Sequence, residues 1–138
     1  EEDSRRKVII ADAVEGILDL DESFDLIFLD AYGPASAPEK LISIPFITRL
    51  SELLVPGGWA VGNFWTMNGD FEEQCSRWKK IYPTLYQART RPTANKIIFG
   101  RKHGKASLNG SLKDRARFLQ KKTGLDMLKM LVNLEKID

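Results

Sequence analysis

The sequence predicts an α/β fold, in which crossover helices join the strands of a mostly parallel sheet and an antiparallel hairpin follows near the end. Three observations predict it. Short apolar runs without alternation are typical of strands buried on both faces. Amphipathic helical stripes separate these runs, and two strand-like runs lie close together before residue 102. The expected order is β-α-β-α-β-α-β-β-α-α, an alternation that implies parallel strands.

Three strands and two helices are expected before residue 66. The strands are Lys7–Ala11, Phe24–Leu29 and Trp59–Trp65, and the first two are predicted to be covered on both faces. A short helix over Val14–Leu18 follows the first strand. A longer helix, with Pro45 in its first turn, is expected to stop at Pro56-Gly57-Gly58.

The remaining elements follow from capping signals and periodicity. Asp70 is a predicted N-cap for a helix whose buried face is formed by Phe71, Cys75, Trp78 and Ile81. Thr84–Thr90 and Lys96–Arg101 are expected to form the antiparallel hairpin. Ser111 opens a helix through Lys122, Gly124 ends it, and Leu125, Leu128, Leu131 and Val132 indicate a last short helix.

The charge is distributed unevenly along the chain of 138 residues. Residues 1–100 carry 11 basic and 15 acidic side chains, whereas residues 101–123 carry 8 basic side chains and Asp114 alone. An acidic body therefore precedes a basic segment. The acidic body favours a cationic amine as substrate, and clustered cations could also contact nucleic acid, an interpretation that we do not favour.

Composition narrows the class of protein. A single cysteine, Cys75, excludes an intramolecular disulfide and favours a reducing compartment, so we expect a cytoplasmic protein. No apolar stretch approaches the roughly 20 residues that span a bilayer, and no membrane partner is expected. His103 stands alone in a basic loop, so no metal site is predicted. The chain begins without Met and almost at once with a strand-like run, which suggests a piece of a longer protein.

Two carboxylates follow strand-like runs. Asp12 comes after Lys7–Ala11, and Asp30 after Phe24–Leu29. Ligands of parallel α/β sheets bind beyond the carboxyl ends of the strands, so we expect Asp12, Asp30, Asn63 and Trp65 along one rim. The simpler alternative is that each acid is only a loop residue or a helix cap.

The segments VIIADAVEGI (residues 8–17), FDLIFLDAYGP (residues 24–34) and ITRLSELLVPGGWAVGNF (residues 47–64) match a known pattern. With them the chain resembles the C-terminal part of the spermidine synthase-like (polyamine aminopropyltransferase) family, within the Rossmann-like class I S-adenosylmethionine-dependent methyltransferase fold. The resemblance implies a partial domain of that kind over residues 1–102 and leaves residues 103–138 as a basic helical extension.

The resemblance also implies roles for individual residues. Asp12 and Ala13 would hold the adenine of S-adenosylmethionine or its decarboxylated form, with no metal. Asp30 would contact the same co-substrate. It would also be the catalytic acidic residue, whose carboxylate orients or deprotonates an attacking amine, such as a polyamine. Tyr32 would contact the substrate.

The chain also departs from the family's pattern. The family's glycine-rich first loop and its ribose-binding acid are absent, as are its first two strands. Gly33 stands where aminopropyltransferases usually have a second acid. The missing strands would leave the edges of Lys7–Ala11 and Phe24–Leu29 unpaired, so we expect a homo-oligomer.

Two functional alternatives remain at this point. One is a non-catalytic assembly or interaction module derived from the same fold. The other is a nucleic-acid methyltransferase, for which only the shared fold and the basic segment argue.

Overall fold

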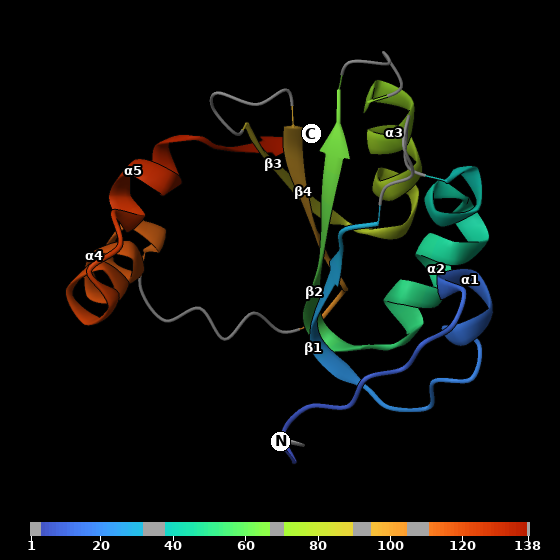
Figure 1. The fold of residues 1–138 in the computed structure, drawn as a ribbon. Coiled ribbons are helices and arrows are strands. Elements are labelled where there is room, and N and C mark those ends of the chain that lie inside the picture. Colours follow the sequence, from blue (N-terminus) through green and yellow to red (C-terminus); the bar gives the residue numbers. More distant parts are fainter. Residues whose placement is uncertain (1–3, 32–37, 67–70, 90–94, 105–110, 138) are drawn as a thin grey trace.

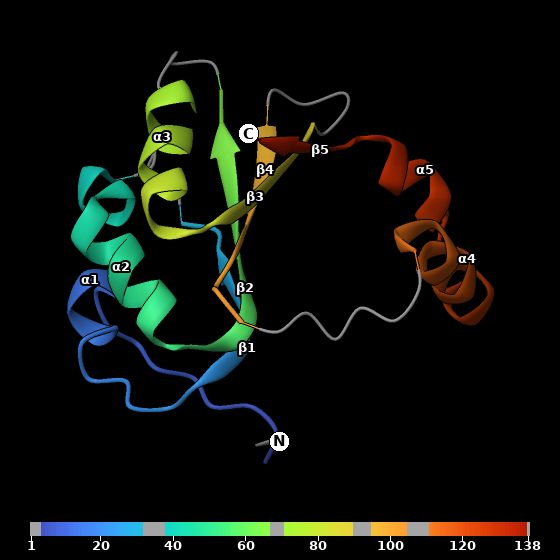
Figure 2. The same cartoon turned by 180° about the vertical axis from the view of Figure 1, so that it is seen from behind.

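The computed structural model describes residues 4–31, 38–66, 71–89, 95–104 and 111–137. Within these ranges the chain forms a five-stranded mixed sheet with helices on both sides (Figures 1 and 2), so the predicted α/β, Rossmann-like class is confirmed. The elements in chain order are α1 (Ala13–Gly16), β1 (Phe24–Leu29), the 3-10 helix η1 (Glu39–Ile42), α2 (Ile44–Glu52), β2 (Leu54–Trp65), α3 (Phe71–Ile81), β3 (Thr84–Arg89), β4 (Asn95–Arg101), α4 (Leu112–Thr123), α5 (Met127–Val132) and β5 (Leu134–Ile137).

The order of the strands across the sheet is β1-β2-β4-β3-β5. β1 runs parallel to β2, and the other neighbouring pairs are antiparallel, so the described sheet is mixed and not mostly parallel as expected. The predicted hairpin of β3 and β4 is confirmed, with Tyr86 opposite Phe99. β5 was not predicted from the sequence. It pairs with β3 and returns the chain to the sheet after α5.

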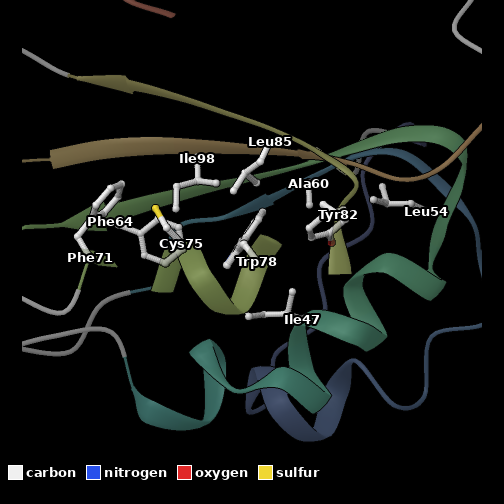
Figure 3. Close-up of a cluster of buried hydrophobic side chains, with 10 residues drawn as sticks. All are labelled: Ile47, Leu54, Ala60, Phe64, Phe71, Cys75, Trp78, Tyr82, Leu85 and Ile98. Atoms are coloured by element: carbon white, nitrogen blue, oxygen red, sulfur yellow. The ribbon is translucent and has the colours of Figure 1, made fainter. Parts of the chain in front are cut away.

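The core lies between the sheet and α2 and α3 (Figure 3). Trp78 of α3 is completely buried, and its ring meets that of Phe64 edge-on, with 5.7 Å between centroids. Ile47 of α2 and Ile98 of β4 are also completely buried. Apolar residues at helical spacing on α2 and α3 thus face one side of the sheet, as their periodicity predicts.

The predicted buried face of α3 is confirmed. Phe71, Cys75 and Trp78 are buried, and Ile81 packs against them while partly exposed. The predicted N-cap of this helix, Asp70, lies outside the described residues.

The end of α2 differs from the prediction. Ser43 caps its start by accepting a hydrogen bond from the Phe46 N–H, and Pro45 lies in the first turn as expected. The helix ends at Glu52, and β2 already begins at Leu54. The glycine-rich turn therefore lies inside a long irregular strand, where Gly57 has a φ of 83° and the pairing with β1 shifts register.

The predicted strand at Lys7–Ala11 is wrong. This segment has no regular secondary structure, and the side chain of Ile10 is 98% exposed. A strand needs a neighbour to satisfy its N–H and C=O groups, and in the described part of the chain the order of the sheet begins at β1. Local apolar sequence alone was therefore not sufficient to make a strand. The short helix expected after it is present as α1.

β1 has the predicted boundaries, but the prediction that it is buried on both faces is wrong. Ile27 and Leu29 pack against the helices, whereas Leu26 is 46% and Phe28 70% exposed on the opposite face. Helices α1, α2 and α3 lie on one side of the sheet, and α4 and α5 on the other (Figures 1 and 2). The described residues leave the second face of β1 uncovered.

The basic extension forms the two predicted helices. Ser111 caps α4 by accepting from the Asp114 N–H at 3.2 Å, and Gly124 ends the helix with a φ of 75°. α5 then leads into β5. The division into domains at residue 102 stays a prediction. Among the helices described, none has both the length and the apolar character needed to cross a membrane.

Candidate functional site

Asp30 follows the last residue of β1 and hydrogen-bonds to the neighbouring strand. Its Oδ1 accepts from the Asn63 side-chain amide at 3.0 Å. Because β1 and β2 are parallel and Leu29 lies opposite Gly62, the next residues of both strands come together at one edge of the sheet. Asp30 is exposed, and its Oδ2 has no hydrogen-bond partner among the described residues.

Asn63 links Asp30 to a third strand. Its Oδ1 accepts from the side-chain amide of Asn95 at 2.9 Å. An asparagine amide offers donors on one side and an acceptor on the other, so this arrangement uses both and fixes which side faces the carboxylate. The carboxylate therefore has a supported orientation, although it lies at the surface.

The pair formed by Asp30 and Asn63 belongs to the face of the sheet opposite α1, α2 and α3. Along β2, Ala60 and Phe64 are buried toward these helices, while Trp59 and Asn63 are partly exposed on the other face. This is the alternation that a strand imposes. The expectation that Asp30 and Asn63 share a rim is confirmed by their hydrogen bond.

Asn95 was not singled out by the sequence. It lies at the start of β4 and is paired with Trp65. The signal that could have identified it is the register of β4 against β2, which cannot be read from either strand alone.

Asp12 lies at the N-terminus of α1. Its Oδ1 accepts from the backbone N–H of Val14 at 2.8 Å and of Glu15 at 3.4 Å, so it is a helix cap. Its Oδ2 has no partner within the described ranges, and the backbone N–H of Ala13 is in the first turn, where helices leave such groups unpaired. Because the strand expected before Asp12 does not form, Asp12 does not follow a strand as Asp30 does. Its role in binding stays a prediction.

Tyr32 and Trp65 are the two remaining residues that the sequence predicted at the site. Tyr32 lies outside the described residues. Trp65 is the last residue of β2 and is 53% exposed at the same end of the strand as Asn63.

The described residues contain no group of three or more His, Cys, Asp and Glu side chains that could hold a metal ion. Cys75 is buried against Trp78 and Phe71 in the core. Burial, with a smaller contribution from Glu72, raises the pKa of its thiol to about 11, while Lys96 opposes this shift. The thiol is therefore protonated near neutral pH and is not an activated nucleophile.

Comparisons with known proteins agree with this fold. Residues 1–63 match the model of a family of S-adenosyl-L-methionine-dependent methyltransferases. No curated protein sequence matches the chain. The crystal structure of human methyltransferase-like protein 13 in complex with SAH is similar with a TM-score of 0.71 and 20% identity, over 87% of this chain and 59% of that one.

Two further solved structures are similar to the chain. A probable spermidine synthase from Corynebacterium glutamicum has a TM-score of 0.69 and 19% identity, over 100% of this chain and 50% of that one. Spermidine synthase from Thermotoga maritima has a TM-score of 0.61 and 20% identity, over 89% and 51%. The chain thus spans between half and three-fifths of the length of these structures. It has the fold of the class I S-adenosylmethionine-dependent methyltransferases, which the spermidine synthases share.

Proposed function

We propose that the chain is the part of a spermidine synthase-like transferase that alkylates an amine, with S-adenosylmethionine or its decarboxylated form as co-substrate. The observation that carries this proposal is the carboxylate of Asp30, held by Asn63 at the carboxyl end of parallel strands. The fold and the family match over residues 1–63 support the same class of co-substrate.

The residues around Asp12 fit the adenine of such a nucleoside. The free Oδ2 of Asp12 is an acceptor suited to an exocyclic amine, and the unpaired N–H of Ala13 is a donor suited to a ring nitrogen. The capping hydrogen bonds to Oδ1 hold the carboxylate in place without occupying Oδ2. Asp12 and Ala13 are thus the nucleoside-binding residues of the proposal.

Asp30 acts on the acceptor. A sulfonium nucleoside supplies an electrophilic carbon and leaves as a neutral thioether. Oδ2 of Asp30 accepts a hydrogen bond from the neutral acceptor amine and takes up the proton that its nitrogen releases as the N–C bond forms and the S–C bond breaks. Asn63 fixes the direction of the carboxylate, which contributes through alignment of the amine. Tyr32, two residues after Asp30 in the sequence, is the proposed substrate contact.

Calorimetric titration with S-adenosylmethionine, decarboxylated S-adenosylmethionine and methylthioadenosine tests the proposal. The titration is applied to the 138-residue chain and to any longer protein that contains this chain. Asp30→Asn should remove alkyl transfer while nucleoside affinity is largely kept. Asp25→Asn is the matched control, because Asp25 is an exposed acid on β1, the strand that Asp30 follows. Absence of nucleoside binding by every form would instead support a non-catalytic module.

Methyl transfer is the second candidate, and the family match over residues 1–63 favours it. Mass spectrometry of an amine acceptor after incubation with each co-substrate distinguishes the two. An added methyl group from S-adenosylmethionine would assign the chain to the methyltransferases, and an added aminopropyl group from the decarboxylated form to the spermidine synthase-like enzymes.

A further inference from the structure

An apolar groove of about 720 Å³ lies between the sheet and the two C-terminal helices. Its floor includes Trp59, Tyr86, Ile97 and Phe99 from three strands, and its roof includes Leu119 of α4 and Met130 of α5. In Figures 1 and 2 the two helices stand beside the sheet on the side opposite α1, α2 and α3. We call this space the α4–sheet groove.

The side chains of the groove do not fill it. Leu119 is 40% and Met130 is 55% exposed, although both line the same space as the apolar floor. Apolar surface left in water costs roughly 25 cal/mol per Å² relative to its burial. The volume also lies within the range of about 300–1,000 Å³ that is usual for small-molecule sites. The groove therefore has the size and lining of a site for an apolar ligand.

The charged side chains that line the groove are Arg89 and Arg115. Both are exposed, and neither forms a hydrogen bond or an ion pair within the part of the chain that the structure describes. The acid nearest in sequence, Asp114, is already bonded to Ser111 at 2.7 Å and Arg117 at 3.3 Å. Two guanidinium groups without a partner among the described residues thus border an apolar space, and a guanidinium is well suited to bind a carboxylate.

We infer that the α4–sheet groove binds a free long-chain fatty acid, with its alkyl chain along the aromatic floor and its carboxylate at Arg89 and Arg115. The charge of the lining excludes a cationic amphiphile and favours a single anionic group. A groove with the sheet on one side and two helices on the other holds a single alkyl chain, whereas a bilayer surface needs a broad, flat apolar face. Met127 and Met130 can adapt to chains of different shape. This inference is independent of the proposed transferase activity.

Displacement of the fluorescent fatty acid cis-parinaric acid tests the inference. Palmitate, kept below its micellar concentration, should displace the probe from the 138-residue chain more strongly than hexadecanol, which has the same alkyl length without the charge. In the Arg89→Gln/Arg115→Gln variant the affinity for palmitate should fall by about ten- to a hundredfold, the usual worth of hydrogen bonds to charged groups. The affinity for hexadecanol should stay within a factor of about three, since its contacts are apolar.

Arg117→Gln is the matched control, because Arg117 lies on the same helix but outside the groove lining and should leave both affinities unchanged. Ala88→Phe, which adds a ring to the floor, should weaken palmitate and hexadecanol together while the circular dichroism spectrum is kept. Three results would each overturn the inference: no displacement by palmitate, equal loss of palmitate affinity in the control and the double variant, or association with phosphatidylglycerol vesicles without displacement of the probe in solution.

Discussion

The hydrogen bond between Asp30 and Asn63 leads to a quantitative prediction about the stability of variants that add a charge at position 63. In Asn63→Asp a second carboxylate replaces the amide that now donates to Asp30 at 3.0 Å. The variant loses one hydrogen bond and gains a repulsion between like charges. We therefore expect the stability of Asn63→Asp to depend on pH, whereas Asn63→Ala, which loses the hydrogen bonds to both Asp30 and Asn95 but adds no charge, is the uncharged reference.

The magnitude follows from the separation and the exposure of the two side chains. Two unit charges about 4 Å apart interact by about 1 kcal/mol in water and about 4 kcal/mol at an effective dielectric of 20. Because Asp30 is exposed, the value near 1 kcal/mol applies. Each lost hydrogen bond adds about 1 kcal/mol: Asn63→Asp loses the bond to Asp30, and Asn63→Ala loses that bond and the one from Asn95. At neutral pH each variant should thus cost about 2 kcal/mol of unfolding free energy, and the part due to repulsion, about 1 kcal/mol, is specific to Asn63→Asp.

The difference between the variants should depend on pH. The repulsion exists only in the folded state, so the folded Asn63→Asp variant binds protons more tightly than its unfolded chain, and acidification relieves the penalty. Urea denaturation followed by tryptophan fluorescence at pH 7 and at about pH 3, where carboxylates are largely protonated, measures this. The double variant Asp30→Asn/Asn63→Asp restores one amide and one carboxylate and should recover most of the loss. A difference between the variants that is the same at both pH values, or no recovery in the double variant, would refute the reasoning.

Three further predictions concern the core, the thiol and the open edge of the sheet. Ile98→Ala should lower the free energy of unfolding by about 2–5 kcal/mol because Ile98 is completely buried. Val132→Ala, at a site that is 82% exposed, should lower it by less than about 0.5 kcal/mol. Similar urea midpoints for the two variants would contradict the described core. The thiol of Cys75 is buried and its pKa is raised to about 11, so at pH 8 it should react with a disulfide reagent only as fast as the protein opens. Denaturant should accelerate the reaction. Immediate labelling of the native protein would show that the thiol is accessible. Phe28 is 70% exposed on the uncovered face of β1 and should contribute to the self-association that we predict. Phe28→Ser should therefore lower the sedimentation coefficient at high concentration, whereas Phe118→Ser, at an exposed site on α4, should not. A wild-type protein that sediments as a monomer at all concentrations would exclude the homo-oligomer.

The elements that the sequence predicted correctly are those whose pattern is determined locally and whose partners lie in the chain. α3 carries an apolar stripe that meets β2 and β4, so its periodicity was sufficient. β3 and β4 are separated by a short connection and pair with each other. Lys7–Ala11 has an equally apolar sequence but no described neighbour, because the strand order begins at β1. A β-strand forms only when a neighbouring strand pairs with it, and the sequence of one segment does not specify that neighbour.

The same distinction explains which parts of the site were predictable. Asp30 could be placed because it directly follows a strand with clear boundaries. Asn63 could be placed on the same rim because parallel strands end at the same edge. The support of Asn63 by Asn95 depends on the antiparallel register between β2 and β4, which residue pattern alone does not determine.

The loss of the strand at Lys7–Ala11 affects Asp12 less than the sequence argument would suggest. That argument positioned Asp12 by the end of a strand. In the structure its carboxylate is positioned by two hydrogen bonds to the first turn of α1. The segment that follows α1 is anchored in turn, because Ile17 is buried with Leu41 and Phe46 in the helix layer. Asp30 is held by the sheet and Asp12 by the helices, so a perturbation of one should not displace the other. Nucleoside affinity and alkyl transfer are therefore expected to be separable by mutation.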